Sequence, residues 1–290
     1  MDTTYNLTFE QIVSASARLY RESLTTLPGD ITETLKGALK KERNTRAKEI
    51  LRTLMKSALT SREKGQYLCT DPGLPFFYLK IGGLVTFDFD IEEAVKEGIA
   101  KLGDESYPPF FPMATDPVNR NRSYVGEKVP VVTYDIIPHS HRVEMICIPK
   151  GSGGQHYSRV EMFGVVGLET VKKFVVETVQ TASGKACPPL VVGIGIGGTF
   201  ETVTKLSGEA LIRDIRKRNG RPEIGRLELE LLDELNDLNI GPMGLGGNTT
   251  VIGVNVEIGG TTSVLTPVAV NVCCWARRMT RKNISVRGHS

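Results

Sequence analysis

Short runs of β-branched and aromatic residues alternate with segments of helical periodicity along most of this chain, and this alternation restricts the fold most strongly. The apolar run Leu190–Ile196 has the length of a buried strand, and the segment Phe200–Arg218 behind it has apolar residues at helical intervals. Strands interleaved with helices predict an α/β fold, with a mixed sheet core and flanking helices. Further strands are predicted at 75–81, 129–137, 143–148, 249–258 and 264–274, and further helices at 160–182 and 227–238.

The N-terminal part of the chain is predicted to be helical. Residues 9–22 and 31–59 carry apolar side chains at helical spacing, and Pro28-Gly29-Asp30 separates them, with Asp30 as the expected N-cap. We therefore expect a helical N-terminal segment over residues 1–65 in front of a larger region over residues 66–290.

Charge and hydropathy argue against several classes of partner. The 290-residue chain has a formal net charge of +3 without a long block of one sign, which favours neither nucleic acid nor a membrane as a partner. The N-terminus is acidic where a signal peptide needs basic residues, and no apolar stretch approaches the roughly 20 residues of a membrane helix. We expect a cytoplasmic protein.

Five dispersed cysteines, an odd number, do not resemble the disulfide framework of a small secreted protein. In a reducing compartment such residues are buried structural side chains, a nucleophile or metal ligands, and the absence of a CxxC pair leaves these alternatives open. Four of the cysteines stand beside turns at three ends of predicted elements: Cys69, Cys187 and the Cys273-Cys274 pair. Thiolates at strand ends can converge at one sheet edge, where backbone N–H groups suit the sulfides of an iron–sulfur cluster.

Five segments, in the same order, resemble the boxes that characterise the α-type catalytic domain of class I fumarases and L(+)-tartrate dehydratases. The resemblance covers roughly residues 10–280 and treats residues 66–290 as the iron–sulfur hydro-lyase domain, with the whole chain as one continuous family domain. LCTDPG resembles the family's CQDTG box, and KGSGG resembles its KGxGSEN box. The segments are LCTDPG at 68–73, KGSGG at 150–154, ACPPLVVGIGIGGTFE at 186–201, NIGPMGLGGNTTVIGV at 239–254 and PVAVNVCCWARR at 267–278.

The resemblance implies a set of cluster ligands, namely Cys69, Cys187 and Cys274. Cys274 is preferred over its neighbour because the family places an aromatic residue or His, then Ala and Arg, directly after the ligand, as in Cys274-Trp275-Ala276-Arg277. Cys273 and Cys147 match no ligand position of the family, so we expect both to be small buried hydrophobic residues.

Three protein ligands imply a [4Fe–4S] cluster with one open iron, which acts as a Lewis acid toward a substrate hydroxyl and carboxylate. The resemblance gives Asp71 the position of the acid that takes part in proton transfer. From the residues alone, the alternative is an aspartate that stabilises the turn before Pro72-Gly73.

Several departures from the family fall on expected substrate contacts. Thr70 replaces the Gln of CQDTG, Thr262 stands where the family has a His, and PPFFPM at 108–113 replaces the segment with a substrate arginine. Arg120 and Arg122 are possible substitutes for that arginine, because a guanidinium binds a carboxylate in a bidentate way. In the second box, Lys150 and Gly151 are implied substrate contacts, although a solvated loop lysine is the alternative for Lys150.

Two further motifs have competing interpretations. The run Gly193–Gly198 matches a dinucleotide fingerprint, but the acid about 20 residues on, Asp214, lies in a basic helical stretch. In the family these glycines let the backbone approach the cluster or substrate, and the alternative is plain packing. His139 and His141 have strand spacing for a metal, yet we expect them in an exposed turn after Pro138.

The resemblance predicts an enzyme of a particular kind, the α subunit of a two-subunit hydro-lyase that hydrates or dehydrates a small hydroxy-di- or carboxylic acid, fumarate/malate- or tartrate-like. No β-type domain follows Arg278, so we expect a separate β-type subunit in a heterotetramer. The first alternative is a diverged cluster-bearing subunit that regulates or assembles without catalysis. The second is an unrelated α/β binding protein with inert cysteines.

Overall fold

The computed structural model describes residues 4–289, which form two compact units assembled from separate parts of the sequence. Unit 1 contains the chain up to Leu27, the segment Ala58–Lys150 and the chain from Arg278 onward, and unit 2 contains Pro28–Ser57 and Gly151–Arg277. Both units combine helices with sheets, so the predicted α/β class is confirmed. The units do not divide at residue 65, because the helical N-terminal segment contributes to both.

Unit 1 is built on a mixed four-stranded sheet of order β12-β7-β2-β6, in which β2 and β6 are parallel and the other neighbours antiparallel. Two helices that pack on each other, α1 (Phe9–Thr25) and α4 (Ile91–Glu105), contribute to the core with this sheet. The strands of the main sheet are β2 (Phe76–Gly82), β6 (Val131–Ile137), β7 (Val143–Cys147) and β12 (Thr280–Ile284). Short ladders join β1 (Thr4–Asn6) to β3 (Val85–Thr86) and β13 (Arg287–His289), and β4 (Ala114–Thr115) to β5 (Arg122–Ser123).

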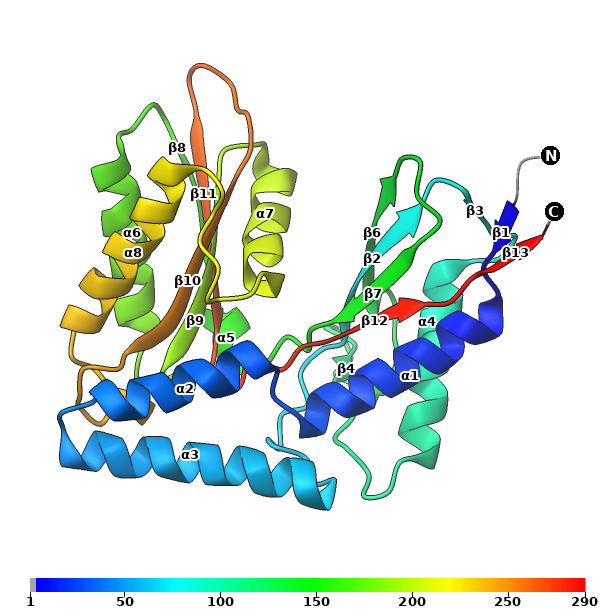
Figure 1. The fold of residues 1–290 in the computed structure, drawn as a ribbon, viewed down its shortest axis with the longest axis horizontal. Coiled ribbons are helices and arrows are strands. Elements are labelled where there is room, and N and C mark those ends of the chain that lie inside the picture. Colours follow the sequence, from blue (N-terminus) through cyan, green and yellow to red (C-terminus); the bar gives the residue numbers. More distant parts are fainter. Residues whose placement is uncertain (1–3, 290) are drawn as a thin grey trace. The chain divides into compact units, whose positions relative to one another are not determined.

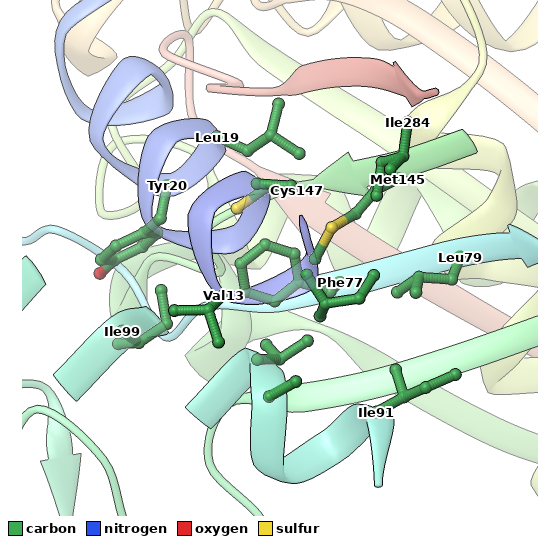
Figure 2. Close-up of a cluster of buried hydrophobic side chains, with 14 of the residues drawn as sticks. Val13, Leu19, Tyr20, Phe77, Leu79, Ile91, Ile99, Met145, Cys147 and Ile284 are labelled. Atoms are coloured by element: carbon green, nitrogen blue, oxygen red, sulfur yellow. The ribbon is translucent and has the colours of Figure 1, made fainter. Parts of the chain in front are cut away.

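The core of unit 1 contains Cys147, which Figure 2 shows among the apolar side chains of α1, β2 and β7. The residue is fully buried, and burial raises the pKa of its thiol, outweighing the hydrogen bond with Ser23 and the nearby Arg278, which lower it. A thiol in such surroundings stays protonated and behaves as a small hydrophobic side chain. The prediction that Cys147 is a buried hydrophobic residue is confirmed.

Unit 2 is built on a second four-stranded sheet, of order β10-β9-β11-β8. Helices α6 and α8 pack together on one face of this sheet, and α7 packs on the other (Figure 1). The strands are β8 (Arg159–Phe163), β9 (Leu190–Ile196), β10 (Val251–Ile258) and β11 (Thr266–Cys273). The helices are α2 (Gly29–Lys41), α3 (Thr45–Lys64, which continues into unit 1), α5 (Ser152–Tyr157), α6 (Leu168–Ala182), α7 (Phe200–Ile212) and α8 (Pro222–Asp237), with a 3₁₀ turn η1 (Pro242–Gly244).

Several predicted element boundaries were wrong. The predicted helix 160–182 is the strand β8 followed by α6, because Gly164 and Gly167 interrupt the helical pattern. The predicted helix 31–59 is the pair α2 and α3, and α7 ends at Ile212 instead of Arg218. Helix α4 was not predicted, although Asp90 caps its first turn. No helix in the described part of the chain is long and apolar enough to cross a membrane.

Glu42 fixes the turn between α2 and α3 to the loop before β10, within unit 2. Its carboxylate accepts hydrogen bonds from the backbone N–H groups of Asn44 and Asn248, and from the Thr249 hydroxyl at 2.7 Å. Burial alone would raise the pKa of Glu42, but these hydrogen bonds and one from the Arg43 N–H lower it below its ordinary value.

We expect Glu42→Gln to lower the free energy of unfolding at neutral pH by about 1–3 kcal/mol, because a neutral amide replaces a carboxylate that accepts several hydrogen bonds. A carboxylate with a lowered pKa stabilises the fold above its unfolded pKa, and this contribution is lost as the pH falls through the folded pKa. Urea denaturation at pH 7 and below pH 4 should therefore show a gap between wild type and variant that closes on acidification. The exposed Glu49→Gln is the matched control, and a gap that stays constant with pH would contradict the assignment.

Candidate functional site

Cys187 lies in the turn between α6 and β9, with its side chain exposed. Its backbone has a φ of +53°, in the left-handed region that a non-glycine residue adopts rarely. Its carbonyl accepts a hydrogen bond from the Trp275 N–H at 3.1 Å. This bond joins the Cys187 turn to the segment that carries the second candidate ligand of unit 2.

Cys274 follows the last residue of β11 directly and is half-buried. Its neighbour Cys273 is paired with Val191 of β9 inside the ladder and is 9% exposed. The hydrogen bond from Trp275 to Cys187 places the two segments next to each other at the same end of the β9–β11 pair. The structure thus brings Cys187 and Cys274 together locally, while Cys273 is buried as predicted.

The segments of the second and fourth boxes pack around this strand end. A Cβ on Gly154 of α5 would lie 2.3 Å from the Val272 carbonyl oxygen, so only glycine fits there. From the fourth box, the Met243 N–H donates to the Pro188 carbonyl at 2.8 Å, and Gly244 contacts the backbone of Gly184. Sequence boxes far apart in the chain therefore assemble around the Cys187 turn.

The glycine-rich run begins in the middle of β9 and continues past the end of the strand that lies away from Cys187. A Cβ on Gly193 or Gly195 would come within 2.4 Å of carbonyl oxygens of α7, which shows that these glycines allow close packing of helix on strand. Gly197 and Gly198 have positive φ and contact Gly259 and Thr202, respectively. The structure shows packing, the alternative for this run, while its approach to the cluster or substrate stays a prediction.

Thr262 shares that distant end of the sheet. The neighbouring Thr261 hydroxyl donates to the Gly198 carbonyl at 3.0 Å, and all of β11 separates this loop from Cys274. At about 3.3 Å per strand residue, the eight residues of β11 span roughly 25 Å. Within unit 2 the structure does not bring Thr262 to the cysteine pair.

In unit 1, Cys69 and Asp71 belong to an exposed loop that is held at its C-terminal side. The Asp71 carboxylate accepts the Gly73 N–H at 2.8 Å, and the Tyr20 hydroxyl donates to the Gly73 carbonyl at 2.7 Å. Residues Leu74 and Lys150 exchange two backbone hydrogen bonds of 2.9 Å. Asp71 therefore stabilises the turn before Gly73, which was the alternative role expected for it. The same hydrogen bond fixes the orientation of its carboxylate.

Lys150 is 8% exposed, and its ammonium lies 5.6 Å from the centre of the Phe76 ring. The alternative of a solvated loop lysine is therefore wrong. Gly151, the N-cap of α5, opens unit 2. A buried ammonium beside the Asp71 loop is suited to an anionic group.

A cavity of about 610 Å³ lies beside Cys69 and Thr70 in unit 1. Apolar residues of the PPFFPM segment line it. Arg122 stacks on Phe111, one of the lining residues, with its guanidinium carbon 5.0 Å from the ring centre, whereas Arg120 lies in an exposed turn with a φ of +66°. The full lining is Tyr67, Cys69, Thr70, Pro72, Pro109, Phe110, Phe111, Pro112 and Tyr124.

For Arg278 the sequence leaves substrate binding and surface or structural pairing open, and the structure shows it as a buried cation of unit 1. It is 4% exposed, and within residues 4–289 its Nε and Nη1 atoms have no hydrogen-bond partner. Burial raises the pKa of Tyr20, and the Arg278 charge acts against this shift, so the two groups are close. A buried guanidinium with unused donors fits an anionic ligand. Arg277, by contrast, is paired within unit 2.

The three candidate cluster ligands lie in two different units. Within residues 4–289 no three side chains of His, Cys, Asp or Glu are grouped closely enough to hold a metal ion. Cys187 and Cys274 belong to unit 2 and Cys69 to unit 1, and all three are exposed or half-buried at loop positions. In unit 2, the accessible thiols of Cys187 and Cys274 beside the end of β11 fit the ligation of an iron–sulfur cluster. His139 and His141 lie in an exposed turn, as predicted, where His141 stacks on Tyr5.

Comparisons with known proteins support the family resemblance of the five sequence segments. The sequence pattern of the fumarate hydratase (Fumerase) family matches residues 13–283. A protein of Methanocaldococcus jannaschii, provisionally named L(+)-tartrate dehydratase subunit alpha, is 37% identical over 95% of this chain and 98% of its own length. The L(+)-tartrate dehydratase subunit alpha of Escherichia coli K12 is 33% identical over 88% of this chain and 84% of its own length. The chain therefore belongs to the fumarate hydratase (Fumerase) family, whose members are iron–sulfur-dependent hydro-lyases.

Proposed function

We propose that this chain is the α subunit of a hydro-lyase that adds water to, or removes it from, a small hydroxy-di- or carboxylic acid, fumarate/malate- or tartrate-like. The observation that carries the proposal is the junction of the Cys187 turn with the Cys274 segment through the Trp275 hydrogen bond. Two candidate thiolates at one strand end are what cluster binding requires of this unit.

Cys69, Cys187 and Cys274 are the proposed ligands of a [4Fe–4S] cluster with one open iron. When bound, such a cluster supplies a Lewis acid that binds the substrate hydroxyl and makes it a better leaving group. The exposed and half-buried positions of the three side chains make their sulfurs accessible, in contrast to the buried Cys147 and Cys273.

Asp71 is the proposed proton acceptor at the substrate carbon. The hydrogen bond from the Gly73 N–H fixes one carboxylate oxygen, and this restricts the direction in which the other can act. Lys150, Gly151, Thr70 and Arg122 are the proposed substrate contacts in the adjoining boxes and at the cavity, and the Arg278 guanidinium adds positive charge to unit 1. Arg120 and Thr262 stay predictions.

Asp71→Asn is expected to lower kcat for hydration by about 10²–10⁴-fold, because the amide cannot accept the proton. Its carbonyl oxygen can still accept the Gly73 N–H, so the loop and the iron content should be unchanged. Steady-state kinetics with iron analysis checks this prediction. Loss of iron, or full activity with Asn at this position, would show that Asp71 serves only the turn.

A separate β-type subunit and a heterotetramer are part of the proposal. The relatives named above carry the designation subunit alpha, which supports a partner subunit for this chain as well. Anaerobic co-purification with a β-type subunit, followed by a hydration assay over a panel of diacids and hydroxy acids, is the experiment that tests the function.

The apolar lining of the cavity beside Cys69 favours one second candidate. Prolines and phenylalanines there cannot replace an arginine in binding a carboxylate, which supports a diverged cluster-bearing subunit that regulates or assembles without catalysis. A preparation that contains the cluster but turns over no acid in the panel would establish this candidate instead.

A further inference from the structure

The sheet of unit 2 has two edges that differ in how their backbone groups are used. At the β10 edge, the Val256 N–H donates to the buried Glu228 carboxylate at 2.8 Å. The Val256 carbonyl accepts from the Asn219 side chain at 2.9 Å, and the Val254 carbonyl accepts from Arg218 at 3.1 Å. Side chains thus occupy the backbone groups that another strand would need at this edge.

The β8 edge of the sheet is open. The pairing of β8 with β11 shows which backbone N–H and C=O groups of β8 point outward. The Pro267 carbonyl accepts the Gly197 N–H on the β9 side, so Pro267 directs its backbone away from β8. In an antiparallel pair, consecutive residues alternate between the two sides. Pro267 is the partner of Met162, and therefore Met162 and Val160 direct their N–H and C=O groups to the open edge. Because β8 is the terminal strand of its sheet, no further strand among residues 4–289 pairs with these groups.

The side chains of β8 make this edge complementary to itself. Arg159 and Glu161 lie on the same face of the strand, both are exposed, and Val160 between them is 37% exposed. If two copies of β8 pair antiparallel around a two-fold axis at Val160, each Arg159 lies opposite the Glu161 of the other copy. A two-fold axis at residue 159 or 161 would instead place like charges opposite each other, which is unfavourable.

We propose that β8 is a homodimerisation edge, at which a second copy of this chain pairs through Val160 and continues the sheet of unit 2 across the two-fold axis. The charge pattern selects the second copy as the occupant, since both complementary groups belong to the same strand. The dimer is isologous, as a closed two-fold assembly requires. This assembly does not depend on the proposed hydro-lyase chemistry, so either can fail without the other.

Charge exchange at β8 tests the pairing in the full-length chain by sedimentation analysis. Arg159→Glu and Glu161→Arg should each weaken the dimer about tenfold or more, because each single variant places two pairs of like charges opposite each other. The double variant restores the complementary pairs and should recover the dimer. A monomeric wild type, or a dimer that the single variants leave unchanged, would overturn the proposal, and a double variant without recovery would overturn the register.

A cysteine at the two-fold axis gives an independent readout. Directly opposite residues of a hydrogen-bonded antiparallel pair have Cα atoms about 5.5 Å apart, which is within the range of a disulfide. Val160→Cys should therefore form a covalent dimer on mild oxidation well above the wild-type background. Leu229→Cys on α8, where the side chain is 48% exposed, is the matched control. Equal cross-linking of both variants, or a gain in mass only with a β-type subunit, would contradict pairing with a second copy.

Discussion

Cys274→Ala is expected to remove the cluster and with it the hydration activity, whereas Cys273→Ala retains both. The two residues are neighbours, but Cys273 is paired with Val191 inside the ladder, and Cys274 lies beyond the strand end next to the Cys187 turn. A Lewis-acidic metal contributes several kcal/mol to such a reaction, so its loss should lower the rate by about 10³-fold or more. The measurements are the visible absorption spectrum, the iron content and the hydration rate of anaerobically purified variants.

The neighbouring pair also supplies its own control, because both variants remove one thiol from the same segment. Cys273→Ala leaves a cavity near β9 and should lower only the thermal stability. Cys147→Ala, in the core of unit 1, should behave in the same way. Colour lost with Cys273→Ala and kept with Cys274→Ala would reverse the ligand assignment.

Asp30→Asn is expected to destabilise unit 2 by about 3–5 kcal/mol, since it leaves the charge of Arg277 buried without its partner. Arg277 is fully buried, forms an ion pair with the Asp30 carboxylate and donates to the Leu211 carbonyl at 2.7 Å. Asp30 also accepts the Ile215 N–H, so it connects α2 with the segment after α7. It was expected to be the N-cap of α2, but Pro28 has that position and Asp30 lies inside the first turn.

An exposed pair between the same two segments serves as the matched control. Glu33 of α2 pairs with Arg216, and both side chains are about half exposed. Glu33→Gln should therefore change the stability by no more than about 1 kcal/mol. Denaturant titrations that follow the unfolding of unit 2 would distinguish the buried Asp30–Arg277 pair from the exposed Glu33–Arg216 pair. An unfolding midpoint of Asp30→Asn that coincides with that of Glu33→Gln would contradict a structural role for the buried pair.

The sequence allowed prediction of those features that depend on neighbouring residues. Strand β9 and the turn at Cys187 follow from an apolar run next to two prolines, whereas the choice of Cys274 rests on the family resemblance of the three residues behind it and stays a prediction. Helix α4 could have been predicted from Asp90 and the apolar spacing after it, but the signal was missed.

Other features depend on partners that are distant in the sequence. Burial of Lys150 requires Phe76 and the bridge with Leu74, and burial of Arg277 requires Asp30, which is 247 residues away. No local pattern specifies such pairs. The separation of Thr262 from Cys274 likewise follows from the antiparallel ladder of β9 and β11, which places the loop and the cysteines at opposite strand ends.

The central claim is that the thiolates of Cys69, Cys187 and Cys274 bind a cluster in which one iron has no protein ligand. A Mössbauer spectrum of the ⁵⁷Fe-labelled protein, recorded with and without a hydroxy-diacid, tests this claim most directly. The account predicts that one iron of the cluster differs from the rest and that its signal shifts when the acid is added. A spectrum in which all irons have the same sulfur environment and none responds to the acid would contradict it.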